Sequence, residues 1–78
     1  RMKVAVYAPP FCDHSGLSAE GFLELSEGAV LRDVFRKLKI PALLRPFLIV
    51  TVNYEKSPGS RPLQEGDTVS IFWPLSGG

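Results

Sequence analysis

The alternation of apolar and polar residues predicts extended strands near both ends of the chain. Every second residue of segment 2–8 is apolar, and this apolar face is formed by Met2, Val4, Val6 and Ala8. Towards the other end, Val69 and Ile71 alternate with Thr68 and Ser70, so one face of the last strand can join a core while the other meets water.

Three further extended segments are predicted between these strands. Residues 21–25 form a second strand, which is antiparallel to the first because the proline- and glycine-rich loop 9–18 is too short for a parallel crossover. Residues 48–52 are almost continuously apolar, which is typical of a strand in the interior of a sheet. Residues 62–63 are expected to pair briefly before a turn at 65–67.

Apolar residues at helical spacing predict one amphipathic helix, whose inward side is formed by Val30, Leu31, Val34, Phe35 and Leu38. Pro41 prevents this helix from continuing. Val30 has no polar atom that could cap the first turn, so Asp33 or Ser26 must supply an acceptor. Residues 42–47 are expected to form an irregular connector. At Pro58-Gly59 a type II turn is expected, in which Gly59 has a positive φ.

The predicted order is strand, strand, helix, strand, short strand and strand. Because only one helix is available, it must cover one face of one mixed sheet. No repeat or change of composition divides the 78 residues, so residues 1–78 are expected to form a single α+β domain.

Composition narrows the classes of function. The chain has 9 Lys and Arg residues against 8 Asp and Glu residues, and its net charge of +1 argues against a nucleic-acid binder. No apolar run is long enough to span a bilayer, and no signal-peptide pattern opens the chain. The single cysteine cannot form an internal disulfide, which fits a reducing compartment, so we expect a cytoplasmic protein.

Cys12, Asp13 and His14 are the only residues with obvious side-chain reactivity. A metal site needs about four ligands, usually in spaced pairs, and a nucleophile and its base normally meet from distant parts of a chain. We therefore expect no metal site and no side-chain active site here. The interpretation is an exposed polar loop in which Cys12 is partly covered.

The end of the chain carries the candidate chemistry. Pro74 cannot donate to a strand ladder, so regular pairing should stop near it and a flexible tail should begin at about this residue. Gly77 and Gly78 have no Cβ, which makes the tip thin enough for a narrow channel in another protein. A disposable terminus is rarely as apolar as residues 72–75, which favours docking. The pattern indicates the α-carboxylate of Gly78 as the reactive group.

Four short motifs occur in the order found in a known family. They are Ser26-Glu27-Gly28-Ala29, Val50-Thr51-Val52-Asn53, a Leu-x-x-Gly-Asp-x-Val pattern at residues 63–69, and Pro-Leu-Ser-Gly-Gly at residues 74–78. Together they resemble the small subunit of molybdopterin synthase and the sulfur carrier of thiamine biosynthesis, which are ubiquitin-like. The resemblance implies a β-grasp fold, with four to five strands in a mixed sheet and one main helix. It also implies that the first and last strands lie side by side and parallel in the middle of the sheet.

The resemblance further implies how the tail is used. The sequence has no Gly-rich phosphate loop, so a ubiquitin-activating-type enzyme would adenylate Gly78 with ATP. A sulfurtransferase donor would then supply the sulfur of a thiocarboxylate. The tail would deliver this sulfur in the active site of the molybdopterin-synthase large subunit, for molybdenum cofactor biosynthesis. The chain would hold no stable cofactor or metal, and would be the non-catalytic, sulfur-donating subunit of a sulfurtransferase complex.

Individual residues of the tail take roles under this resemblance. Gly77 would let the backbone lie flat in the partner's tunnel, next to the reactive carboxylate of Gly78. Contacts with the partner would be made by Phe72, Trp73, Pro74, Leu75 and Ser76.

Other functions remain open at this point. The chain could carry sulfur for another pathway, such as a thiamine-type one, or be a ubiquitin-like modifier that Gly78 joins to lysines. It could also be a non-catalytic β-grasp binding module, in which case removal of Gly77 and Gly78 would do no harm.

Overall fold

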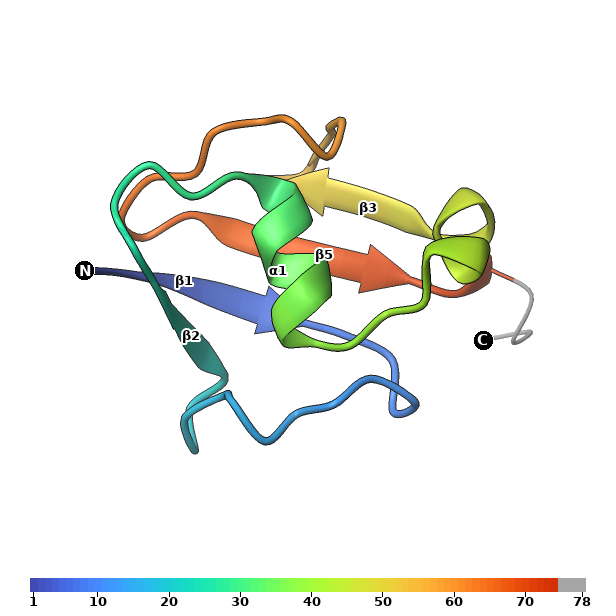
Figure 1. Cartoon of the computed structure of the whole chain (residues 1–78), viewed down its shortest axis with the longest axis horizontal. Coiled ribbons are helices and arrows are strands. Elements are labelled where there is room, and N and C mark those ends of the chain that lie inside the picture. Colours follow the sequence, from blue (N-terminus) through green and yellow to red (C-terminus); the bar gives the residue numbers. More distant parts are fainter. Residues whose placement is uncertain (75–78) are drawn as a thin grey trace.

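A computed structural model of the chain describes residues 1–74, and the predictions for Leu75, Ser76, Gly77 and Gly78 lie outside this part. The described residues form one sheet, one α-helix and one 3-10 helix (Figure 1). In chain order the elements are β1 (Met2–Tyr7), β2 (Phe22–Leu25), α1 (Leu31–Lys37), η1 (Ala42–Phe47), β3 (Ile49–Val52), β4 (Glu55–Lys56) and β5 (Thr68–Phe72).

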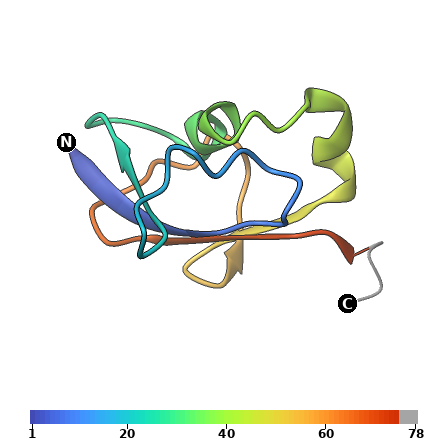
Figure 2. The same ribbon diagram turned by 90° about the horizontal axis from the view of Figure 1, so that it is seen from below.

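The five strands form one mixed sheet in the order β2-β1-β5-β3-β4. β1 and β5 run parallel, whereas the pairs β1–β2, β3–β5 and β3–β4 are antiparallel. Both α1 and η1 lie on the same side of this sheet (Figures 1 and 2). The predicted β-grasp fold is thus confirmed, including the antiparallel first pair and the parallel pairing of the first and last strands in the middle of the sheet.

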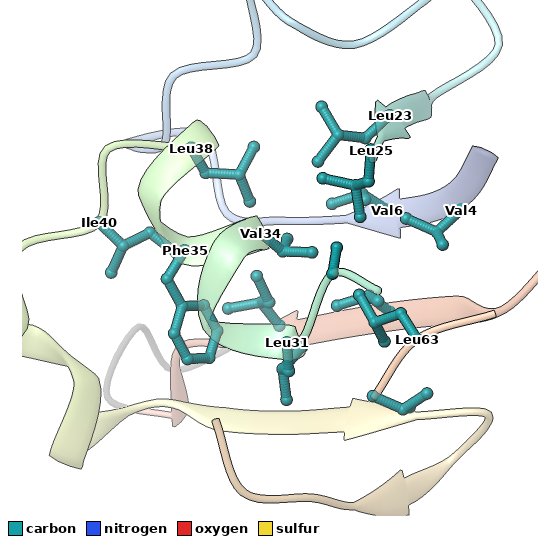
Figure 3. Close-up of a cluster of buried hydrophobic side chains, with 14 of the residues drawn as sticks. Val4, Val6, Leu23, Leu25, Leu31, Val34, Phe35, Leu38, Ile40 and Leu63 are labelled. Carbon is teal, nitrogen blue, oxygen red and sulfur yellow. The ribbon is translucent and has the colours of Figure 1, made fainter. Parts of the chain in front are cut away.

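The core lies between α1 and the sheet (Figure 3). Its largest fully buried side chains come from the helix, its C-cap and three strands, and they are Leu31, Val34, Leu38, Val4, Val52 and Val69. Burial of one such side chain contributes about 1.5–3 kcal/mol. The helical spacing in the sequence therefore identified the inward side of α1, except that Val30, the N-cap, is only partly buried.

The first turn of α1 is satisfied mainly by backbone carbonyls from a distant loop. The amides of Leu31 and Arg32 donate to the carbonyls of Arg61 and Gly59, at 2.9 and 2.8 Å. The amide of Val30 donates to the carboxylate of Asp33 at 2.8 Å. Asp33 therefore supplies the acceptor predicted from the sequence, and the loop supplies the rest.

The connector between α1 and β3 is more regular than predicted. Residues 42–47 form the 3-10 helix η1 and not an irregular segment. The amide of Leu44 donates to the carbonyl of Pro41 at 3.0 Å, and the amide of Leu48 donates to that of Arg45 at 3.1 Å. Hydrogen bonds over three residues explain how this short, proline-containing stretch stays ordered.

No strand of the sheet forms at residues 62–63, where a short one was predicted. The short strand is β4, which a two-residue turn joins to β3 in a hairpin. Asn53 and Tyr54 form this turn with positive φ values of 52° and 69°, as in type I′ turns. Pro62 makes only an isolated bridge, to Val30. The segment around Pro62 thus pairs with the entry to α1 and not with the sheet.

The turn around Gly59 also differs from the prediction. Gly59 does not have a positive φ, so the expected type II turn is absent there. The turn closes later, where the amide of Arg61 donates to the carbonyl of Pro58 at 3.0 Å. A Cβ on Gly59 would lie 3.6 Å from atoms of the Arg32 side chain. Packing against α1, and not a special φ, therefore sets the backbone path at this glycine.

Candidate functional site at the end of strand β5

Strand β5 anchors the last described residues in the middle of the sheet. β1 pairs with one edge of it and β3 with the other. Val69 and Ile71 are buried in the core. The ladder with β3 ends where Phe72 faces Ile49, two residues before Pro74. The prediction that regular pairing stops near Pro74 is confirmed.

The start of β5 is braced by a small polar network. Gly66 adopts a φ of 85°, which allows the tight turn into the strand. The Asp67 carboxylate accepts the amide of Gln64 at 2.9 Å and the side-chain amide of Asn53 at 3.0 Å. Asn53 in turn accepts the amide of Thr68 at 2.9 Å. The Gly-Asp and Asn positions of the recognised motifs thus hold β5 at its first residue.

The residues just after β5 contact the loop that follows β1. The ring of Trp73 meets the ring of Phe11 edge to face, with centroids 5.6 Å apart and an interplanar angle of 76°. Pro9 and Pro10 line a shallow groove together with Phe72, Trp73 and Pro74. The structure therefore brings the predicted docking residues Phe72, Trp73 and Pro74 together, and it adds Phe11 to them.

Apolar side chains gather on the sheet face opposite α1, near the end of β5. Phe72 is 53% exposed, and its cross-strand neighbour Ile49 is exposed as well. Tyr7 on β1 is in register with Ser70 on β5, so it lies on the same face as Phe72. Exposed apolar side chains grouped in this way are typical of an interaction surface.

The loop after β1 places Cys12, Asp13 and His14 in three separate environments. Cys12 is buried, and this burial raises the pKa of its thiol. The Asp13 carboxylate accepts the amide of Ser15 at 2.9 Å, which lowers the pKa of that carboxyl. A ring nitrogen of His14 lies 3.0 Å from the carbonyl oxygen of Pro9. These contacts give the three side chains structural roles within the loop.

Residues 1–74 form the described part of the chain. This part of the chain contains no group of three or more His, Cys, Asp or Glu side chains placed to hold a metal ion. None of its helices has the length and apolar character needed to cross a membrane.

Fold and site together define a ubiquitin-like β-grasp domain whose central strand leads into the C-terminal segment. The model of the ThiS family matches residues 15–78, most of the chain, and the protein belongs to the ThiS family. Members of this family are sulfur carriers that work with adenylating enzymes and sulfurtransferases, so a general sulfur-carrier role follows. Searches of curated proteins and of solved structures found no significant match.

Sequence patterns gave no signal for two features of this site. Phe11 lies in the loop 9–18, and only the fold brings it to Trp73, 62 positions further along the chain. Its position directly after Pro9-Pro10, which restrict the backbone, is the one local hint. The exposure of Tyr7 next to the end of β5 likewise depends on the parallel pairing of β1 and β5.

Proposed function

We propose that this sulfur carrier holds its sulfur as a thiocarboxylate on Gly78 and acts as the small subunit of molybdopterin synthase. The observation that carries the proposal is the position of β5. This central strand is paired on both sides and ends in an exposed apolar segment immediately before the terminal Leu-Ser-Gly-Gly sequence. The family match to residues 15–78 supports sulfur carriage in general.

Activation of Gly78 requires a partner enzyme. A carboxylate is a poor electrophile, and the sequence lacks the Gly-rich loop that would cradle a nucleotide phosphate. In the proposed reaction, an oxygen of the Gly78 carboxylate attacks the α-phosphorus of ATP in an adenylating enzyme, and pyrophosphate leaves. The outer sulfur of a persulfide on a sulfurtransferase donor then attacks the acyl carbon, and AMP leaves. A second thiol of the donor cleaves the resulting acyl disulfide, which releases the thiocarboxylate on Gly78 and leaves a disulfide on the donor. ATP is thus used by the partner, and the carrier retains no cofactor.

Docking would be performed by the apolar segment at the end of β5. Phe72 and Pro74 are exposed, and Trp73 is held from one side by Phe11. Aromatic side chains are enriched in the cores of protein interfaces. We propose that these residues, together with Leu75 and Ser76, guide the tail into the adenylating enzyme and then into the large subunit of the synthase.

The reaction predicts that Gly78→Val folds normally but is not adenylated. A side chain at this position would obstruct both the approach to a narrow tunnel and attack at the carbonyl carbon. The measurement is ATP–pyrophosphate exchange with a cognate adenylating enzyme, together with circular dichroism of the variant. We expect a loss of exchange of at least about a hundredfold.

Gln64→Ala is a suitable control, because this exposed residue lies at the far end of β5 from Phe72. It should exchange like the unchanged protein. Efficient adenylation of Gly78→Val would refute the mechanism. Intact mass of the protein from its native cell provides an independent check, because loading replaces one C-terminal oxygen by sulfur.

The ThiS family match also favours a second candidate, a carrier for a thiamine-type pathway. The two candidates share activation of Gly78 and differ in the acceptor of the sulfur. Loaded carrier should transfer sulfur to a pterin precursor only when the molybdopterin-synthase large subunit is added. Transfer to a thiazole-forming enzyme instead would replace the first candidate by the second. Recovery of Gly78 on lysines of other proteins would identify a modifier.

A further inference from the structure

A cavity lies on the side of the sheet that α1 covers, opposite the face that carries Tyr7 and Phe72. Its volume is about 400 Å³, and it is bounded by α1, η1, β3 and the segment that follows β4. Phe35, Leu48 and Val50 give it an apolar wall, and Arg45 and Lys56 add two cations. Figure 3 shows Phe35 pointing from α1 toward the sheet beside β3. We call this cavity the Arg45 pocket.

Arg45 is fixed in the pocket by an aromatic ring and not by an acid. Its guanidinium carbon lies 5.0 Å from the centroid of the Phe35 ring, within the range of a cation–π contact. Ala42 also lines the pocket, because residues three apart share one side of a 3-10 helix. Within residues 1–74, the buried Nε of Arg45 has no hydrogen-bond acceptor. Arg45 is also partly buried and has no carboxylate partner in this part of the chain, so its guanidinium favours an added anion.

Positive charge is concentrated around the Arg45 pocket. In the described part of the chain, neither Arg45 nor Lys56 forms an ion pair, and neither does Arg32, whose side chain packs on Gly59 at the pocket wall. Arg61, which is also near the pocket, is paired, because its guanidinium lies 3.4 Å from the carboxylate of Glu55. The chain as a whole carries a net charge of only +1, so this excess is local.

We propose that the Arg45 pocket binds a small phosphate monoester whose ring or other apolar body lies against Phe35, Leu48 and Val50. A phosphate dianion matches several unpaired cations better than a single carboxylate does, and a guanidinium can donate two parallel hydrogen bonds to it. The apolar wall favours an ester over free phosphate, and the cavity has the size of a small-molecule site. The residues of the pocket lie between positions 35 and 59, far from Gly78 in the sequence, and binding there does not depend on sulfur transfer.

The test is a titration of the full chain with phenyl phosphate, followed by amide chemical shifts in ¹H–¹⁵N NMR spectra at constant ionic strength. We expect saturable shifts at α1, η1 and the segment around Lys56, weaker binding of inorganic phosphate and no binding of phenol. Lys56→Gln should weaken binding of phenyl phosphate about fivefold, and Arg45→Gln about tenfold. Since Arg45 also packs on Phe35, the exposed Lys56 gives the decisive variant.

Lys37→Gln is the matched control, because Lys37 is an exposed lysine of α1 that does not line this pocket. It should bind phenyl phosphate like the unchanged chain. Shifts that spread over all basic residues without saturation would overturn the proposal. So would equal binding by Lys56→Gln and the unchanged chain, or inorganic phosphate binding as tightly as phenyl phosphate.

Discussion

At the scale of single residues, the hairpin between β3 and β4 is the most strained part of the described backbone. Lys39, Asn53 and Tyr54 are the residues other than glycine with positive φ in residues 1–74, and two of them are adjacent in this turn. Asn tolerates the left-handed region better than most residues, and the side chain of Asn53 is also held by a hydrogen bond to Asp67 at 3.0 Å. Tyr54 has no such compensation, and its side chain is 80% exposed.

Tyr54→Gly should therefore increase the free energy of unfolding, by about 0.5–1 kcal/mol. Glycine removes the conflict between Cβ and the backbone, although part of this gain is offset by the greater freedom of glycine in the unfolded chain. Urea denaturation followed by circular dichroism measures the change. Tyr54→Ala keeps the strain and loses only an exposed ring, so it should change stability by less than about 0.5 kcal/mol. Equal stability of the Gly and Ala variants would contradict the strain.

The buried Cys12 allows a prediction on pH. Burial raises the pKa of its thiol above the ordinary value of 9.0 in the folded protein. A raised pKa stabilises the fold below the pKa of the unfolded thiol, and this contribution is lost as the pH rises through the folded value. At pH 8, iodoacetamide should alkylate Cys12 at least about tenfold more slowly in the folded chain than in urea. Equal rates in both conditions would show that the thiol is accessible and ionised.

At the scale of elements, α1 depends on its surroundings. It has 7 residues, which is too short for stability in isolation. Its apolar side is buried against the sheet, and the carbonyls of Gly59 and Arg61 accept its first amides. The loop between β4 and β5 is therefore a structural part of the helix and not a spacer. Because this loop also borders the Arg45 pocket, packing of the helix and shape of the pocket are connected.

Asp33→Ala should lower the free energy of unfolding by about 1 kcal/mol, because the amide of Val30 loses its acceptor and the first turn loses a negative charge. Asp33→Asn retains an oxygen acceptor and should lose less than half of this amount. Arg36→Ala removes the exposed ion pair with Asp33 at 3.4 Å and should change stability by about 0–0.5 kcal/mol. If Asp33→Asn were as destabilised as Asp33→Ala, the hydrogen bond would not be the main contribution. Thermal or urea unfolding of the three variants gives these values.

At the scale of the whole molecule, the N-terminal part of the chain holds the last described residues. β1 pairs with β5 in the centre of the sheet, and the loop after β1 brings Phe11 to Trp73. The protein thus holds the last described residues from the sheet and from the loop. This arrangement fixes residues 72–74 relative to the sheet.

Phe11→Ala should change the environment of Trp73, which is the single tryptophan of the chain. Loss of the edge-to-face contact should increase quenching of its fluorescence by acrylamide, and should lower stability by about 0.5–1.5 kcal/mol. Phe22→Ala is the control, since Phe22 is also exposed but lies on β2, which β1 separates from β5. Unchanged quenching in Phe11→Ala would mean that Phe11 does not hold the ring.

Local patterns in the sequence predicted four of the five strands, the helix α1 and their order along the chain. Helical spacing identified the inward side of α1, alternation identified β1 and β5, and Gly66-Asp67 marked the turn into the last strand. These features depend on the geometry of a few neighbouring residues, which periodicity and turn chemistry reflect directly. The terminal glycines that carry the proposed chemistry are likewise a property of the sequence alone.

The folded structure alone defines which distant segments contact one another. It placed the carbonyl of Gly59 at the start of α1, the ring of Phe11 against Trp73, and Arg45 over Phe35. At Gly59 the expected positive φ is absent, and the residue lies against the Arg32 side chain of the helix. Such contacts join residues that are far apart in the chain, and no local pattern encodes them, because they arise when the core closes and fixes each backbone relative to the others.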